Sequence, residues 1–117
     1  FGLGNRVIFK IEDASRMSFS EQSFNVIFSI NVFHHLEKSL AVLEEINRLL
    51  RNGGKAVLSD FSDKGLEIIN ACHTAEGRTH DYFKHRLNEA KEYFIRKGFK
   101  IMEYQSQVQK VLIAQRL

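Results

Sequence analysis

The stretch that decides the fold runs from residue 24 to residue 61 and reads FNVIFSINVFHHLEKSLAVLEEINRLLRNGGKAVLSDF. Its first seven residues are a nearly continuous apolar run, which is typical of a strand buried on both faces of a parallel sheet. Leu40, Leu43 and Leu50 then recur at helical spacing, and residues 55–61 return to a strand pattern. A strand, a helix and a second strand in this order predict a right-handed crossover between two parallel strands.

The ends of the predicted helix are marked by its polar residues. Ser39 is available as the N-cap, and Arg48 and Arg51 fall in the last turn, where cations complement the helix dipole. Asn52, Gly53 and Gly54 follow, and these residue types accept the left-handed conformation that ends many helices. We therefore predict that the helix stops at residues 52–54.

The flanking segments extend this pattern in both directions. Residues 6–11 are short and β-branched and predict a strand, whereas residues 12–23 are polar and loop-like. A second helix is predicted from about Asp63 to Gly77, and a third is closed by Gly98. Residues 99–104 and 108–115 predict two strands joined as a hairpin. The fold class is therefore α/β, with a mostly parallel sheet covered by helices on both faces and an antiparallel C-terminal hairpin.

The composition of the 117 residues is that of a single globular domain. Cys72 is the only cysteine, so no intramolecular disulfide can form, and a reducing cytoplasm is the default location. Lys and Arg are interleaved with Glu, which predicts a solvated surface and argues against a nucleic-acid partner. No apolar run approaches the roughly 18 residues of a membrane span, so no membrane partner is expected.

Three motifs in order resemble the class I S-adenosylmethionine-dependent methyltransferase family, over roughly residues 5–60. The first, residues 13–19 (DASRMSF), is similar to the Asp-Ala loop that follows the third strand of that family. The second, residues 23–36, is similar to its fourth strand and the loop beyond it. The third, residues 43–54, resembles its next helix and the Gly-Gly turn before strand five.

The resemblance implies a cofactor, S-adenosyl-L-methionine, and residues that contact it. By analogy with the family, Asp13 accepts a hydrogen bond from the adenine amino group and the Ala14 amide meets a ring nitrogen. Asn31 follows strand four and is expected near the cofactor. Two plainer interpretations stay open, because Asp13 could simply cap its turn and Asn31 could be an ordinary turn residue.

The family's acidic-x-Gly-x-Gly-x-Gly turn is absent from these 117 residues. We therefore interpret the chain as a partial methyltransferase domain, its C-terminal half, with the N-terminal strands missing and little activity of its own. In the family's strand order, 3-2-1-4-5-7-6, the missing strands lie beside the strand at residues 24–30. Its bare edge predicts either pairing with residues 6–11 or a homodimer formed through that edge.

The resemblance implies transfer of a methyl group to an unidentified acceptor, for which we expect a small molecule. A general base is required only if the acceptor must lose a proton, and His34, His80 or Asp81 could serve. The histidines show no metal-ligand spacing, so no metal is expected. The alternative is a non-catalytic methyltransferase-like module used for binding or dimerisation.

Overall fold

The computed structural model of the chain describes residues 6–75 and 85–117. Along these residues the elements are β1 (Phe24–Ile30), a short 3-10 helix η1 (Phe33–His35), α1 (Ser39–Leu49), β2 (Leu50–Phe61), α2 (Asp63–Ala75), α3 (Arg86–Arg96), β3 (Lys100–Gln105) and β4 (Gln109–Gln115). Their alternation confirms the predicted α/β class.

The four strands form one sheet in the order β1-β2-β4-β3. β1 and β2 are parallel and joined by α1, as the crossover pattern predicts. β4 pairs antiparallel with both β2 and β3, so the last strand lies inside the sheet and the hairpin strand β3 lies at its edge. The predicted antiparallel C-terminal hairpin is confirmed, and parallel pairing among the described strands is confined to β1 and β2.

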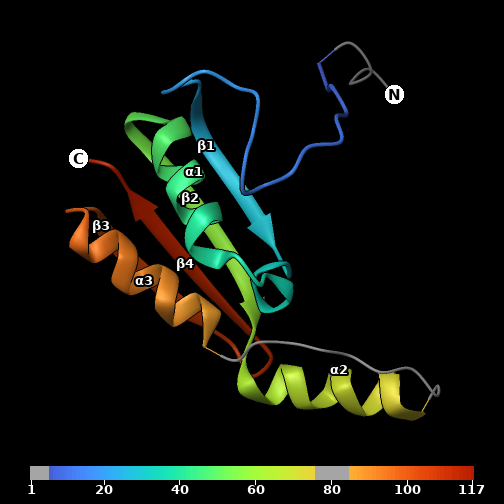
Figure 1. The fold of residues 1–117 in the computed structure, drawn as a ribbon. Coiled ribbons are helices and arrows are strands. Elements are labelled where there is room, and N and C mark those ends of the chain that lie inside the picture. The colour runs from blue at the N-terminus through green and yellow to red at the C-terminus, as the bar shows by residue number, and fades with distance from the viewer. Residues whose placement is uncertain (1–5, 76–84) are drawn as a thin grey trace.

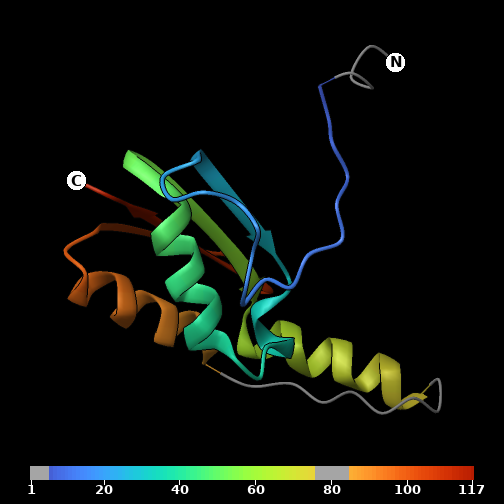
Figure 2. The same ribbon diagram turned by 45° about the horizontal axis from the view of Figure 1, so that its top comes forward.

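α1 and α3 cover one face of this sheet (Figures 1 and 2). The core between them and the strands consists of apolar side chains from every layer: Phe33, Val42, Leu43, Ile46, Leu50, Ala56, Leu58, Ala90, Tyr93, Phe94, Phe99, Leu112 and Ala114. Phe94 is fully buried, and burial of a side chain of this kind stabilises the fold by about 1.5–3 kcal/mol. The helical period of α1 and the two-residue period of β2 and β4 place these side chains on facing surfaces.

The opposite face of the sheet is apolar and carries no helix among the described residues. The strand register places Phe28, Val57, Ile113 and Met102 in one row across all four strands. α2 does not cover this row, because it runs past the end of the sheet (Figure 1). The expectation of helices on both faces is therefore wrong for the described part of the chain, since α1 and α3 pack on the same side.

The prediction of a strand over residues 6–11 is also wrong. None of these residues is paired with a described strand, and Ile8, Phe9 and Ile11 are exposed. A strand-forming sequence gives a strand only where neighbouring backbone satisfies its N–H and C=O groups, and no such neighbour is described here. Pairing of residues 6–11 with β1 within one chain is thus excluded in this structure.

The ends of α1 differ from the prediction at both sides. Lys38 is the N-cap, and Ser39 is already helical, so its predicted capping role is wrong. Arg48 lies in the last turn as predicted, but the helix ends at Leu49 because Leu50 adopts extended backbone and begins β2. Arg51 therefore belongs to a strand.

The two glycines after α1 serve the irregular start of β2 instead of the helix end. Gly53 has a φ of +77°, and its N–H donates to the carbonyl of Arg116 at 3.0 Å. A Cβ at Gly54 would lie 2.8 Å from the carbonyl oxygen of Arg51 and 2.9 Å from that of Asn25. Only glycine lets the two parallel strands approach this closely at residue 54.

The remaining helix ends agree with the sequence to within a residue where they are described. α2 is capped by Ser62, whose Oγ accepts the N–H of Gly65 at 3.1 Å, so the predicted cap Asp63 is the first helical residue instead. Gly98 closes α3 with a φ of +82°, as predicted. Cys72 is exposed on α2, although its pattern favoured a half-buried position. Gly77 lies outside the described residues.

Candidate functional site

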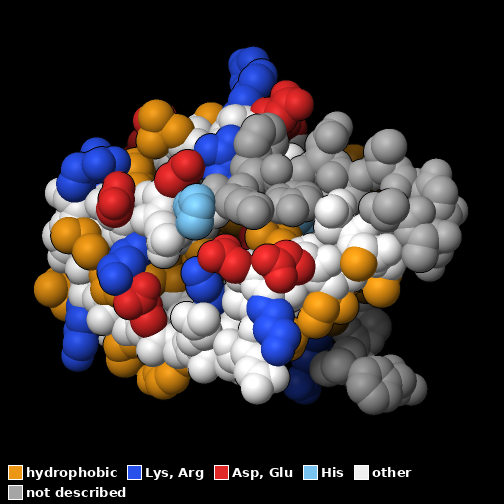
Figure 3. Space-filling view, turned by 90° about the horizontal axis from the view of Figure 1, so that it is seen from below, with side chains coloured by type: hydrophobic (Ala, Val, Ile, Leu, Met, Phe, Trp, Pro, Cys, Tyr) orange, Lys and Arg blue, Asp and Glu red, His pale blue; other side chains and the backbone are white. Residues whose placement is uncertain are grey.

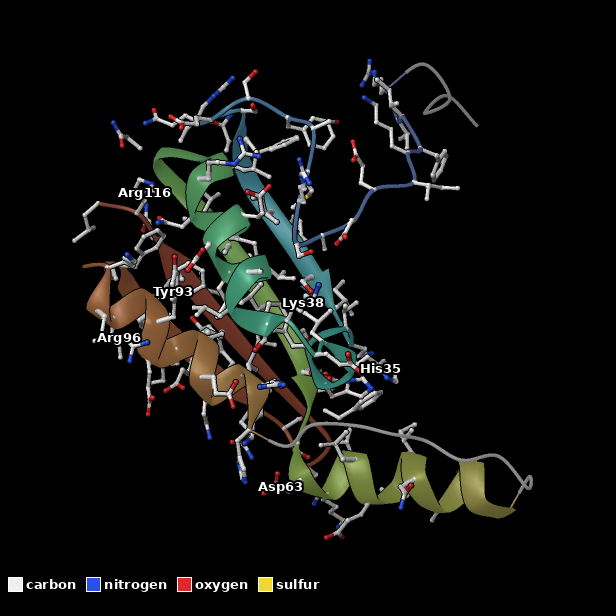
Figure 4. All side chains as sticks on the ribbon, in the orientation of Figure 1. His35, Lys38, Asp63, Tyr93, Arg96 and Arg116 are labelled. Carbon is white, nitrogen blue, oxygen red and sulfur yellow. The ribbon has the colours of Figure 1, made fainter. Side chains whose placement is uncertain are left out.

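Polar side chains gather where the two parallel strands end. Asn31 directly follows β1, Asp63 follows β2, and η1 places His34 and His35 between β1 and α1. Figure 4 shows His35, Lys38 and Asp63 at this end of the sheet. Because open α/β sheets bind ligands beyond the carboxyl ends of their strands, this edge is the candidate site.

The centre of the site is a buried pair formed by His34 and Asp60. Their side chains are 3% and 5% exposed, and Nδ1 of His34 lies 2.7 Å from Oδ1 of Asp60. A carboxylate can only accept hydrogen bonds, so Nδ1 carries the hydrogen and the lone pair of the neutral ring is on Nε2. Asp60 therefore fixes both the orientation and the tautomer of the imidazole.

The carboxylate of Asp60 is also held by backbone. Its Oδ2 accepts the N–H of His34 at 2.7 Å, and its Oδ1 accepts the N–H of Phe61 at 2.8 Å. Burial of a charged group is costly unless it is hydrogen-bonded, and these donors offset that cost. The pair joins the end of β2 to the start of η1.

Asp13 forms the first turn of the loop that leads to β1. Its Oδ1 accepts the N–H of Ser15 at 2.9 Å and the Ser15 hydroxyl at 2.6 Å, and its carbonyl accepts the N–H of Arg16 at 3.0 Å. The hydrogen bonds from Ser15 lower the pKa of the Asp13 carboxyl group. Within the described residues, no hydrogen bond engages Oδ2 of Asp13. The turn role of Asp13 therefore leaves one oxygen available to a ligand.

A broad hollow of about 450 Å³ lies beside this turn. Its walls come from two segments far apart in sequence: Glu12, Asp13, Ala14 and Ser15 on one side, and His35, Leu36, Glu37, Lys38 and Val42 on the other. The structure thus brings the predicted residues Asp13 and Ala14 next to the residue that follows His34.

The loop after Asp13 is fastened to α1 by Glu45 and Arg48. Glu45 accepts the N–H of Met17 at 2.9 Å, and Arg48 donates to the carbonyls of Phe19 at 2.7 Å and Met17 at 3.1 Å. Arg48 also donates to both carboxylate oxygens of Glu45 at 2.8 Å. The hydrogen bond from Arg48 is the main reason that the pKa of Glu45 falls to about 2. This network holds one wall of the hollow in place.

Asn31 has a structural role in the described residues. It adopts a φ of +57°, its N–H donates to the carbonyl of Ser59 at 2.8 Å, and its Oδ1 accepts from Nε2 of Gln109 at 3.0 Å. It is not among the residues that line the hollow beside Asp13. Contact between Asn31 and a cofactor therefore stays a prediction.

Sequence reasoning missed Asp60 and the Glu45–Arg48 network. Both had a signal, because Asp60 is the charged residue on the same face of β2 as Ala56 and Leu58, and Glu45 and Arg48 are three residues apart on one helix face. His80 and Asp81, the other candidate bases, lie outside the described residues.

A family model described as a methyltransferase domain matches residues 2–58, which contain the Asp13 turn, η1 and most of β2. The chain belongs to the class I S-adenosylmethionine-dependent methyltransferase family. S-adenosylmethionine is the cofactor of this family.

Two curated methyltransferases and one solved structure show how far the similarity reaches. The chain is 34% identical over 67 residues to 27-O-demethylrifamycin SV methyltransferase of Amycolatopsis mediterranei, covering 54% of this chain and 25% of that protein. It is 31% identical over 78 residues to a tRNA (carboxymethyluridine(34)-5-O)-methyltransferase of Xenopus tropicalis, covering 59% and 12%. A SAM-dependent methyltransferase structure from Methanosarcina mazei superimposes with a TM-score of 0.62 at 20% identity, covering 93% of this chain and 66% of that one. The chain thus spans a quarter or less of these two curated relatives.

The residues around the hollow fit the adenine end of the methyltransferase cofactor. Adenine presents an amino donor and ring-nitrogen acceptors, and Asp13 Oδ2 and the Ala14 amide offer the complementary acceptor and donor. Leu36 and Val42 supply apolar surface in the same hollow. None of these donors and acceptors needs to leave an existing hydrogen bond among the described residues.

Two further searches of the described residues complete the description of the methyltransferase chain. No three His, Cys, Asp or Glu side chains in that part of the chain are placed to hold a metal ion. No helix there has the length and apolar character needed to span a membrane.

Proposed function

We propose that the protein carrying this chain transfers a methyl group from S-adenosylmethionine to a small molecule. One observation supports this most strongly: the oriented His34–Asp60 pair lies at the same sheet edge as the hollow lined by Asp13 and Ala14, and His35 belongs to that hollow. A cofactor-binding surface and an oriented imidazole are thereby next to each other.

The chain's own residues hold the cofactor by its adenine. Asp13 Oδ2 accepts from the amino group, the Ala14 N–H donates to a ring nitrogen, and the Glu45–Arg48 network keeps the Asp13 loop against α1. S-adenosylmethionine supplies a methyl group on a sulfonium, which is already a good leaving group. Alignment of the acceptor and exclusion of water therefore provide most of the catalysis.

His34 acts where the acceptor must lose a proton. Because Asp60 holds Nδ1–H, the proton is accepted at Nε2, and the Asp60 carboxylate stabilises the imidazolium that results. His80 and Asp81 stay candidate bases from the sequence. An acceptor that reacts without losing a proton needs none of these groups.

The small-molecule acceptor is favoured over a nucleic acid by the surface charge. Figure 3 shows acidic and basic side chains interspersed over the face seen from below, without a basic stripe that would follow a phosphate backbone. One relative is named for a rifamycin acceptor and another for tRNA, so both acceptor classes occur among similar proteins. The cytoplasm remains the proposed location, and a homodimer the proposed assembly.

Methyl transfer from labelled S-adenosylmethionine to small hydroxylated compounds and to tRNA, measured with the full-length protein, tests this proposal. Transfer to a small molecule supports it, and transfer to tRNA alone contradicts the acceptor class. Cofactor binding without transfer to either would favour the non-catalytic module. For the 117-residue chain alone we expect no binding of S-adenosylhomocysteine tighter than millimolar by calorimetry, because it lacks the glycine-rich turn.

A further inference from the structure

β1 is an edge strand without the usual protection against pairing. β2 occupies one side of it, and no described residue pairs with the other. An edge strand presents alternate N–H and C=O groups outward, and proteins normally guard such edges with charges or proline. The sequence of β1, FNVIFSI, contains neither, and Val26, Phe28 and Ile30 are exposed.

The opposite edge of the same sheet is protected. β3 begins with Lys100 and carries Glu103, both exposed, and Glu103 forms an ion pair with Lys91 at 3.0 Å. Charges on an edge strand disfavour the approach of a second strand. The contrast identifies β1 as the edge that is open to a further strand.

The same chain contains a strand-forming segment without a partner. Residues 6–11, RVIFKI, are rich in β-branched and aromatic residues, yet Ile8 and Phe9 are 82% and 92% exposed. With the two-residue period of a strand, Val7, Phe9 and Ile11 share one face and the two cations share the other with Ile8. The segment therefore has one fully apolar face.

We propose that two copies of this chain form a dimer in which residues 6–11 of each copy add as a strand to the β1 edge of the other. This pairing satisfies the outward backbone groups of β1 and of residues 6–11 together. It also places the Val7–Phe9–Ile11 face beside Val26, Phe28 and Ile30, which share one face of β1. The exchange is reciprocal, so two copies close the assembly around a two-fold axis. It goes beyond the proposed methyl transfer and does not depend on it.

The geometry of the loop favours exchange over pairing within one chain. Met17 and Phe19 are bound to α1 through Glu45 and Arg48, so the loop between residues 6–11 and β1 is fixed at its middle. In the single chain residues 6–11 lie apart from β1, as Figure 2 shows for the trace that leads from the N-terminus. A second copy brings the segment to the edge without releasing this network.

Sedimentation velocity and hydrogen exchange of the 117-residue chain test the dimer. We expect a monomer–dimer equilibrium at micromolar concentration, with amides of residues 6–11 protected in the dimer and unprotected on dilution. A chain that stays monomeric at 100 μM, a concentration of about the upper end of that range, overturns the proposal. A dimer in which residues 6–11 exchange freely also overturns it and assigns the contact to β1 itself or to the apolar sheet face.

Proline and alanine at the same positions provide matched variants. Ile8→Pro and Phe9→Pro each remove an N–H from the segment, and one of the two removes a ladder hydrogen bond because alternate residues face the neighbouring strand. Ile8→Ala and Phe9→Ala shorten the same side chains and keep the N–H. We expect one proline variant to dimerise at least about tenfold more weakly than alanine at its position, which corresponds to about 1.4 kcal/mol. Equal dimerisation in both pairs overturns the proposal. Circular dichroism confirms folding of each monomer, because these residues are unpaired in it.

Discussion

Nδ1 of His34 and Oδ1 of Asp60 lie 2.7 Å apart in the interior, although 26 residues separate the two side chains in sequence. The same carboxylate accepts two backbone N–H groups, one of them from His34 itself. The contact therefore fixes the backbone of η1 and the ring that η1 carries. A change at Asp60 should affect both the stability of the fold and the proton on the imidazole.

Asp60→Asn should lower the free energy of unfolding by about 1.5–3 kcal/mol, the typical contribution of hydrogen bonds to a charged group. The amide group of Asn faces N–H donors that it cannot satisfy. Urea unfolding followed by circular dichroism measures the loss. Asp63→Asn, an exposed carboxylate three residues along, is the matched control and should unfold like the wild type. Equal unfolding midpoints for both variants would show that the Asp60 hydrogen bonds contribute little.

The ring tautomer gives an independent measure of the same pair. In the wild type the ¹⁵N spectrum of His34 should show the hydrogen on Nδ1 at a pH where the ring is neutral. Asp60→Ala removes the acceptor and should allow the Nε2–H form, which predominates in free histidine side chains. A His34 ring that already carries its hydrogen on Nε2 in the wild type would contradict the assignment.

Glu45 should make stability depend on pH in the acid range. Its pKa falls from 4.5 in the unfolded chain to about 2 in the fold, so the unfolded state binds a proton first. The stabilisation is complete above pH 4.5 and is lost as the pH falls towards 2. Glu45→Gln should flatten this part of the pH profile in urea unfolding at several pH values. Glu44→Gln, on the exposed side of the same helix, should keep the wild-type slope, and a steep slope in both variants would place its origin elsewhere.

Gly54→Ala should destabilise the sheet by about 1–3 kcal/mol, the usual cost of forcing atoms into a packed interior. The new Cβ would meet backbone oxygens of Arg51 and Asn25 at less than 3 Å, and neither can move without disturbing β1 and β2. Gly53→Asn is the control, since its φ of +77° suits Asn and the space around it is open. Thermal unfolding compares the two, and a smaller effect at Gly54 than at Gly53 would contradict the steric account.

Asp13→Asn in the full-length protein should weaken S-adenosylhomocysteine binding about tenfold to a hundredfold, from the loss of a charged acceptor. Asn keeps the turn with Ser15, so the unfolding midpoint should stay the same. Ser15→Ala has the converse effect: it loosens the turn and leaves the carboxylate. Calorimetric titration separates the two variants. Unchanged affinity in Asp13→Asn would leave Asp13 with only its turn role.

The sequence predicted the elements whose signals are local. The apolar run of β1, the helical spacing of α1 and the left-handed glycine after α3 each depend on residues within one element. Residues 6–11 have the same kind of signal and form no strand, because a strand also requires a partner that lies elsewhere in the chain. The covered face of the sheet has the same origin, since no local pattern states on which side a helix packs.

The site was predictable in part for a similar reason. Asp13, Ala14 and His34 belong to motifs that resemble a family, and the structure places them around one sheet edge. Asp60 escaped prediction because its importance comes from a histidine 26 residues away. The Arg48 contacts to Phe19 and Met17 span about 30 residues and were hidden in the same way.

The hydrogen bond between Asn31 and Gln109 joins residues 78 positions apart, and it lies where β4 inserts between β2 and β3. β1, α1 and β2 are contiguous in sequence and can assemble early, with β2 left bare along one side. That side is filled only when β4 arrives, because β4 comes last in sequence and occupies an interior place. Such distant pairing makes folding slow, so the chain spends time as an incomplete sheet with two open edges. During synthesis, the β2 edge remains available to chaperones or to other nascent chains until Gln109–Gln115 has left the ribosome.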